Sequence, residues 1–354
     1  MMEEKLVLVS GASGYLASWC IKLLLERGYR VRGTVRSLKN PQKVDPVRKL
    51  EPTGKRLELV EADLMKDDTW PKAVKGCDYV LHVASPLVVG GSQKTVDTAI
   101  QGATSVLKAC GDELSVKKVV LTSSSLAICD GHNPPKEYYD ENDWTYIEES
   151  TWYTKSKKLA EEAAWKLYKS GELKNKFDFT VINPGFIVGP PLVDDIGTSV
   201  QLAIQLMTMP MLPKMAFNSI DIRDVAEAHI RALERPETNN HRIAVTEEDP
   251  VSMKDFGIRL KKVFGPLGYS PTTGTLPQFV VKIGSFFSAD MIDVLKMQCY
   301  IRFNNTKMRE LLGMSPRSTL DGMVDMIDEL INRGHIKKTA RWEANKLKSL
   351  AHTS

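Results

Sequence analysis

Short runs of apolar residues recur through the first half of the chain, and segments with helical spacing lie between them. Several runs are apolar throughout and too short for a buried helix, which is typical of strands covered on both faces of a sheet. They lie at residues 5–9, 29–35, 57–60, 79–84, 119–121 and 179–182. After the first run, Leu16, Ile21 and Leu24 follow the period of a helix that stops at Gly28. This alternation predicts an α/β fold with a doubly wound parallel sheet.

The texture of the sequence changes after about residue 184. Proline, glycine and methionine become frequent there, as in Met207, Met209, Met211 and Met215. Short helical patterns dominate, and they lie at residues 225–233, 253–263 and 323–331. We expect three parts, namely an α/β domain over residues 1–184 with a returning strand near 242–246, a smaller and mostly helical lobe over 185–335, and a basic tail over 336–354.

Composition and charge narrow the class of protein. Hydrophobic residues make up 42% of the chain and charged residues 26%, which is ordinary for a globular protein. The longest apolar runs are well below the roughly 18 residues of a membrane span, and the acidic start lacks the basic region of a secretory signal. We therefore expect a cytoplasmic protein without a membrane partner.

The net charge of +4 is concentrated at the C-terminus, where the tail carries several basic residues and Glu343 as its single acidic residue. The rest of the chain is electrically neutral and lacks the spread basic surface of a nucleic-acid reader. The five cysteines show neither a CxxC pair nor metal-ligand spacing, so we expect no disulfide framework and no metal. The sequence leaves monomer and homodimer open.

A glycine-rich turn follows the first predicted strand and opens the first helix. It reads Gly11-Ala12-Ser13-Gly14-Tyr15-Leu16-Ala17. The first glycine permits a tight turn, the second lets backbone N–H groups approach a pyrophosphate at the helix N-terminus, and the small alanine allows close packing on the strand. The turn predicts a dinucleotide site contacted by Gly11, Ser13, Gly14, Tyr15 and Leu16.

The end of the second predicted strand indicates which dinucleotide binds. About twenty residues beyond such a turn, an NAD enzyme places Asp or Glu on the ribose 2′-hydroxyl. Here residues 33–36 contain no carboxylate, and Arg36 closes the strand instead. Its guanidinium can bind a 2′-phosphate, with Lys43 as a second cation. The sequence therefore predicts NADP(H).

Other cofactor contacts are expected where later strands end, because ligands of open α/β sheets bind at the carboxyl edge. The third strand would border the adenine, the fourth would pass beside the ribose and nicotinamide, and the sixth would reach the carboxamide. The residues in these places are Asp63, Leu64, Val83, Ala84, Ser85, Pro184 and Ile187.

A catalytic group is predicted from Tyr153 and Lys157, which stand four residues apart at the start of a helical pattern. That spacing puts phenol and ammonium on one face, where the positive charge lowers the phenol pKa from about 10 toward working pH. Such a tyrosine can exchange a proton with a carbonyl oxygen. Ser124, at the end of the fifth strand, would hydrogen-bond the same oxygen, with Ser125 as the substitute if the register slips by one.

Taken together, these motifs resemble an extended short-chain dehydrogenase/reductase, and within that superfamily the dihydroflavonol reductase and cinnamoyl-CoA reductase group. The resemblance implies a Rossmann domain that binds NADP(H), a Ser124-Tyr153-Lys157 site and a C-terminal lobe that closes over the substrate. The matching segments are residues 11–17, 24–36, 62–64, 82–86, 122–124, 183–184 and 221–229, together with Tyr153 and Lys157.

The sequence departs from the group near the catalytic tyrosine. Cinnamoyl-CoA reductases typically carry N-W-Y-C-Y-G-K there, whereas residues 151–157 read T-W-Y-T-K-S-K. This departure weakens the assignment of a CoA-thioester substrate and leaves it open. We therefore expect an NADPH-dependent reductase of aldehyde or ketone carbonyls, including aromatic and flavonoid-like ones. A hydroxysteroid dehydrogenase or nucleotide-sugar epimerase of the same superfamily is the second hypothesis. A catalytically silent NADP-binding redox sensor is the third, and the presence of all three catalytic side chains speaks against it.

Overall fold

The computed structural model describes residues 4–85, 91–132, 134–148, 150–285 and 300–353, so Pro86 lies outside the described residues. Its main sheet has seven parallel strands, and each predicted strand is present within one to three residues. The strands are β1 (Leu6–Val9), β2 (Arg30–Val35), β3 (Leu57–Glu61), β4 (Tyr79–His82), β5 (Lys118–Thr122), β6 (Asp178–Pro184) and β11 (Arg242–Val245).

The strand order is β11-β6-β5-β4-β1-β2-β3, which is the dinucleotide-binding order with one strand added beyond β6. The returning strand β11 pairs with β6, with Val245 opposite Pro184. The chain reverses its direction of travel across the sheet between β1 and β4, and ligands of such sheets bind at this point, beyond the carboxyl ends of the strands.

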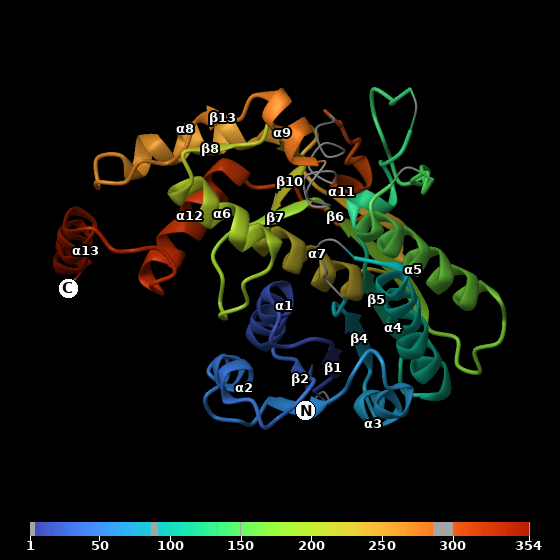
Figure 1. Ribbon diagram of the computed structural model, residues 1–354. Helices are drawn as coiled ribbons and strands as arrows, with labels where there is room; N and C mark the ends of the chain where they lie inside the picture. Colours follow the sequence, from blue (N-terminus) through green and yellow to red (C-terminus); the bar gives the residue numbers. More distant parts are fainter. Residues whose placement is uncertain (1–3, 86–90, 133, 149, 286–299, 354) are drawn as a thin grey trace.

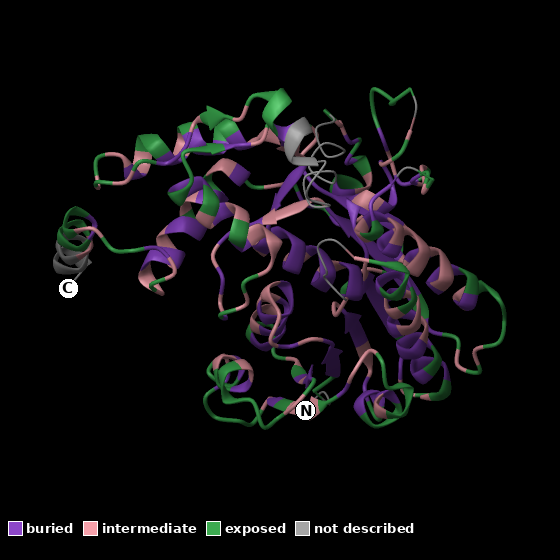
Figure 2. Ribbon diagram, viewed as in Figure 1, coloured by how far each residue is buried: buried purple, intermediate pink, exposed green. Residues whose placement is uncertain are grey.

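Helices cover both faces of the sheet, as the sequence predicts (Figure 1). One face buries α1 (Tyr15–Glu26), α2 (Pro41–Arg48) and α7 (Ile222–Glu234). The other buries α3 (Trp70–Val74), α4 (Gln93–Asp112) and α5 (Trp152–Lys169). The central strands β1, β4 and β5 are buried from both sides, and this explains their unbroken apolar runs, whereas the edge strand β3 is partly exposed (Figure 2).

A smaller lobe has its own apolar core, which includes Met207, Met215 and Phe256. Its main helices are α6 (Thr198–Thr208), α8 (Met253–Phe264) and α12 (Thr319–Asn332), and α9 (Gln278–Ser285), α11 (Thr306–Glu310) and α13 (Ala340–Thr353) complete the C-terminal part. The short strands pair as β7 (Phe186–Val188) with β10 (Ser219–Asp221), β9 (Ala216–Phe217) with β12 (Val251–Ser252), and β8 (Met211–Leu212) with β13 (Gly274–Thr275).

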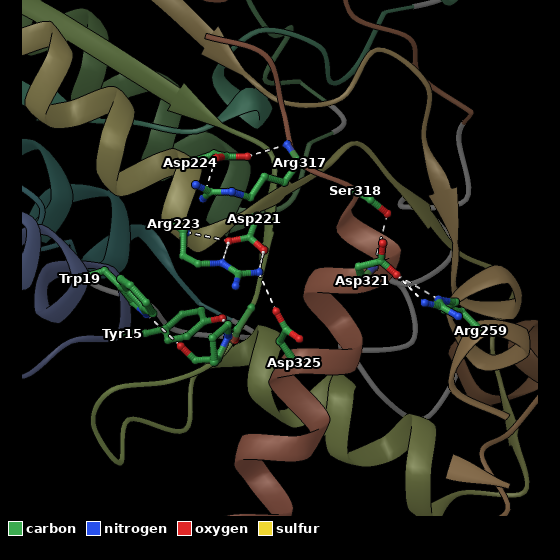
Figure 3. Close-up of polar contacts among 12 residues, drawn as sticks. Tyr15, Trp19, Asp221, Arg223, Asp224, Arg259, Arg317, Ser318, Asp321 and Asp325 are labelled. Carbon is green, nitrogen blue, oxygen red and sulfur yellow. Dashed lines mark hydrogen bonds and ion pairs between the residues drawn. The ribbon is translucent and has the colours of Figure 1, made fainter. Parts of the chain in front are cut away.

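The helix α7 joins the two parts of the chain. Although it lies within the range expected for the lobe, its apolar side chains belong to the core under α1 and the main sheet. At its start, Arg223 bridges the buried Asp221 and Asp325 of α12, and Arg317 pairs with Asp224 (Figure 3). The lobe is therefore fastened to the sheet through ion pairs at the N-terminus of α7.

Candidate active site

The glycine turn follows β1 at the switch point of the sheet, and two features require its glycines. Gly11 has a φ of 70°, and a Cβ there would lie 3.0 Å from the Cβ of Ala84, beyond β4. Gly14 caps α1 without a side-chain hydrogen bond, so no side chain of its own covers the first N–H groups of the helix. The turn thus leaves the first N–H groups of α1 without a cap from its own residues, at the place where a phosphate is expected to lie.

The turn rests on the second strand. A Cβ at Gly33 would lie 2.7 Å from that of Ala12, so only glycine fits beneath the turn. The Thr34 hydroxyl accepts a hydrogen bond of 3.0 Å from Gly11 N, and the Thr34 carbonyl accepts one of 2.8 Å from Ala12 N. Gly33 and Thr34 of β2 therefore hold the glycine turn in place.

Two cations lie near the end of β2, as the sequence predicts. Arg36 is exposed, and within the described ranges no hydrogen bond or ion pair engages it. By contrast, Arg32 on the same strand is bound to Glu58 and to the carbonyl oxygens of Ala73 and Lys75. Arg36, directly after β2, therefore has an open guanidinium at the end of the strand where the cofactor is expected.

Lys43 has a different neighbour, one that the sequence does not predict. Its Nζ pairs with Asp195 at 3.2 Å. The other oxygen of the same carboxylate accepts a hydrogen bond of 3.2 Å from the backbone N–H of Tyr15, the first residue of α1. A carboxylate from the segment before α6 therefore occupies the anion-binding end of the turn.

The remaining predicted cofactor contacts lie along the carboxyl edge of the sheet. Leu64, Ala84, Ser85 and Lys157 line one cavity between α4 and α5, and Val83 directly precedes Ala84. Asp63 caps a local turn by accepting from Met65 N at 3.0 Å. The sequence predicts the adenine, ribose and nicotinamide at these strand ends.

Pro184 and Ile187 lie where the chain leaves the main sheet for the lobe. Pro184 ends β6, whereas Ile187 belongs to β7, which pairs with β10. Gly185 lies between them and packs closely against the backbone before β10, because a Cβ there would lie 2.1 Å from the carbonyl oxygen of Asn218. A ligand at this edge would therefore meet both parts of the molecule.

The three predicted catalytic side chains come from adjacent elements. Thr151 caps α5 by accepting from Thr154 N at 3.1 Å, which places Tyr153 in the first turn and Lys157 one turn later. The Lys157 ammonium donates a 3.0 Å hydrogen bond to the Ser85 hydroxyl. Ser124 follows β5 and faces Tyr153 with a side-chain hydrogen bond. Its hydroxyl also accepts from Leu126 N at 3.2 Å, so Ser124 caps the short helix η2 (Ser125–Ala127) as well.

Burial changes both titrating groups. It raises the pKa of Tyr153 to about 12, while hydrogen bonding with Ser124 acts in the opposite direction. It also lowers the pKa of Lys157 to about 8, and the ammonium lies 5.6 Å from the centre of the Tyr153 ring. The expectation that Lys157 brings the phenol pKa below 10 is therefore wrong for the protein by itself, because loss of water penalises the phenolate more than the ammonium favours it. The phenol keeps its proton at neutral pH, as a proton donor must.

A buried carboxylate holds the catalytic elements together. Glu161, fully buried on α5, accepts hydrogen bonds from the Ser123 hydroxyl at 2.5 Å and from the Asn183 amide at 2.7 Å. It also pairs with Arg242 of β11, whose side chain is 8% exposed. The same Asn183 amide donates to the Ser124 carbonyl at 3.1 Å. Glu161 thus connects α5 to the ends of β5 and β6 and to β11.

Two histidines near the site are structural. His82 hydrogen-bonds the Ser10 hydroxyl at 2.8 Å, and that oxygen accepts from Ala84 N at 2.9 Å. His229 bonds the Thr122 hydroxyl at 2.7 Å and the Val225 carbonyl at 2.8 Å. Burial lowers the pKa of each histidine to about 4. Both are therefore neutral members of the scaffold near neutral pH.

Comparison with known proteins identifies the family. The model of the NAD dependent epimerase/dehydratase family matches residues 7–245. The chain belongs to this family. Cinnamoyl-CoA reductase CAD2 of Medicago truncatula is 40% identical over 238 residues, which cover 64% of this chain and 72% of that protein. Tetraketide alpha-pyrone reductase 1 of Arabidopsis thaliana is 40% identical over 240 residues, with the same two coverages.

Solved reductase structures agree with the fold. The yeast methylglyoxal/isovaleraldehyde reductase Gre2, complexed with NADPH, is 27% identical, with a TM-score of 0.77 over 94% of this chain and 100% of that chain. Vestitone reductase from alfalfa is 26% identical, with a TM-score of 0.73 and the same coverages. The resemblance to reductases and the doubly wound fold are confirmed, and the cofactor of the Gre2 complex is the one that the sequence predicts here.

Sequence reasoning missed two acidic residues of this site. Glu161 could have been predicted, because Tyr153, Lys157 and Glu161 follow one another at intervals of four on one helix. Asp195 was not, since it lies 180 residues from the N–H group that it meets and no local pattern marks it.

Proposed function

We propose that this chain is an NADPH-dependent reductase of aldehyde or ketone carbonyls. The observation that carries the proposal is the meeting of Ser124, protonated Tyr153 and Lys157 at the carboxyl edge of a dinucleotide-binding sheet. The reductases named among its relatives support the same reaction class.

The residues present fit the cofactor. Gly11 and Gly14 keep the turn free of side chains, Gly33 lets it pack directly on β2, and the carboxylate at Tyr15 N marks this helix end as a place that accepts an anion. Arg36 would take the 2′-phosphate, since residues 33–36 contain no carboxylate that would bind the ribose 2′-hydroxyl of NAD instead. NADPH supplies the hydride when it is bound.

Each catalytic side chain has one task in this proposal. The Tyr153 phenol donates its proton to the carbonyl oxygen, and its raised pKa keeps that proton on the phenol until the substrate is in place. The Ser124 hydroxyl donates a hydrogen bond to the same oxygen and steadies it. Lys157 stays within reach of a ribose hydroxyl through its position beside Ser85 and so orients the reacting face.

Apolar side chains of the lobe support an apolar substrate class. Phe186 of β7 stacks on Phe217 of β9 with ring centres 4.7 Å apart, near the point where the chain leaves β6. Exposed Met209 and Met211 add an adaptable apolar surface after α6. Such side chains suit aromatic and other apolar carbonyl compounds. Thioesters are less favoured, because residues 151–157 depart from the cinnamoyl-CoA reductase pattern.

The test is consumption of NADPH and, in parallel, of NADH against aryl aldehydes, aliphatic ketones, a dihydroflavonol and an aromatic acyl-CoA. We expect faster consumption with NADPH than with NADH, and turnover of one or more of the carbonyl compounds. Turnover of the acyl-CoA alone would replace the substrate class. Cofactor binding without turnover of any compound would contradict the proposed function.

A further inference from the structure

The carboxylate of Asp195 lies where the cofactor's own anion is expected. One oxygen accepts from Tyr15 N at 3.2 Å, and the other pairs with Lys43 Nζ at 3.2 Å. The carboxylate also faces Gly14, because a Cβ on that glycine would lie 3.9 Å from it. Gly14, Tyr15 and Lys43 are three of the residues predicted from the sequence to contact the dinucleotide, and all three converge on this one side chain.

The segment that carries Asp195 is anchored at its base. The Tyr15 hydroxyl donates a 2.5 Å hydrogen bond to the Gly189 carbonyl, and Trp19 Nε1 donates one of 2.8 Å to the Pro190 carbonyl. Tyr15 and Trp19 lie side by side on α1 in Figure 3. These contacts keep residues 189 and 190 against α1, so that only the part of the segment after them has to move if Asp195 leaves.

The far end of the segment is tied to the lobe. Asp194 pairs with Arg333 and His335, both at 3.2 Å, just beyond α12. Neighbouring acidic residues thus point to different partners, one toward the lobe and one toward the turn. This arrangement directs Asp195 toward the helix N-terminus. The Asp195 side chain is 35% exposed, so it is only partly in contact with water.

A carboxylate and a phosphate compete for such a place. Both need the same N–H donor and the same ammonium, and like charges that approach closely repel each other. We propose that Asp195 is a built-in competitor of the cofactor, which occupies the anion site of the turn in the free protein and is displaced when NADPH binds. This inference rests on the proposed function, and it assigns to Asp195 control of cofactor affinity rather than a part in the chemistry.

The test is the dissociation constant of NADPH, measured by fluorescence titration of the full chain with wild type and Asp195→Asn. Asparagine keeps the size of the side chain but removes the charge. We expect NADPH to bind about three- to tenfold more tightly, from the sum of a helix-terminus contact and a half-exposed ion pair. Added salt should reduce the difference, because it screens exposed charges.

The matched control is Asp45→Asn, which removes an equal charge from α2 two residues from Lys43. Asp45 is exposed and pairs with Arg48 rather than with the turn, so its variant should bind NADPH as wild type does. Equal tightening in both variants would reduce the effect to overall charge and overturn the inference, as would unchanged or weaker binding in Asp195→Asn. If wild type fails to bind NADPH at all, the proposed function fails instead, so the two failures are distinguishable.

Discussion

Replacing Glu161 by Gln tests the buried network that holds the catalytic elements. Glu161 is fully buried, and its partner Arg242 is 8% exposed. Glutamine preserves the shape, but it leaves the guanidinium without a counter-charge. Ser123 and Asn183 both donate to one oxygen of the carboxylate. An NH₂ group in the place of that oxygen cannot accept either hydrogen bond.

The expected loss of stability is large. Removing one partner of a buried ion pair costs about 3–5 kcal/mol. Arg242 retains hydrogen bonds to the carbonyl oxygens of Glu141 and Asp143 and lies 3.5 Å over the Trp144 ring. These contacts continue to stabilise the guanidinium, so we expect the lower end, about 3 kcal/mol in the free energy of unfolding.

The assay is urea unfolding of wild type, Glu161→Gln and a neighbouring control. Glu162 is the control because it lies on the same helix, 40% exposed, and pairs with Lys158 at 2.9 Å. Glu162→Gln should cost less than about 1 kcal/mol. A second variant, Glu161→Gln with Arg242→Met, should be less destabilised than the sum of its single changes, because the unpaired charge is gone. A loss below about 1 kcal/mol in Glu161→Gln would refute the reasoning.

Two further predictions concern cofactor choice and pH. Arg36→Glu should weaken NADPH binding by about 1–3 kcal/mol more than NADH binding, since it removes a charge-assisted contact to the 2′-phosphate and adds repulsion; parallel titrations check this, and equal weakening would remove Arg36 from the 2′-phosphate. His82 and His229 hold pKa values of about 4 in the fold against 6.5 in the unfolded chain. The unfolded state therefore binds more protons below pH 6.5, and the free energy of unfolding should fall from about pH 6.5 to 4 and be unaffected by these groups above that range. Unfolding curves between pH 4.5 and 7.5 measure it, and a flat profile in wild type, or an unchanged slope in His229→Gln, would contradict it.

The sequence predicts the sheet well because most of its strands are buried on both faces and are therefore short continuous apolar runs. The returning strand at 242–245 is marked by such a run as well. The sequence did not allow us to predict which of the two cores α7 packs against. Its apolar stripe fits either core equally, and only the tertiary contacts show that it packs under α1 and the main sheet.

The site was predictable as far as its residues are neighbours along the chain. Tyr153 and Lys157 share a helix turn, and the glycine turn is contiguous. The pKa of Tyr153 was not predictable, because the loss of water that raises it depends on how distant segments of the chain pack around the start of α5. Asp195 could not be found either, since its meeting with Tyr15 N and Lys43 depends on how residues 189–195 cross back over α1.

The measurement that tests the account most directly compares wild type with Tyr153→Phe. NADPH affinity is measured first, and then turnover of the carbonyl compound on which wild type is fastest. Removing only the hydroxyl should leave cofactor binding nearly unchanged and lower turnover by about 10²–10⁴-fold, the usual contribution of a positioned proton donor. Turnover retained at the wild-type rate would contradict the central claim that Tyr153 supplies the proton.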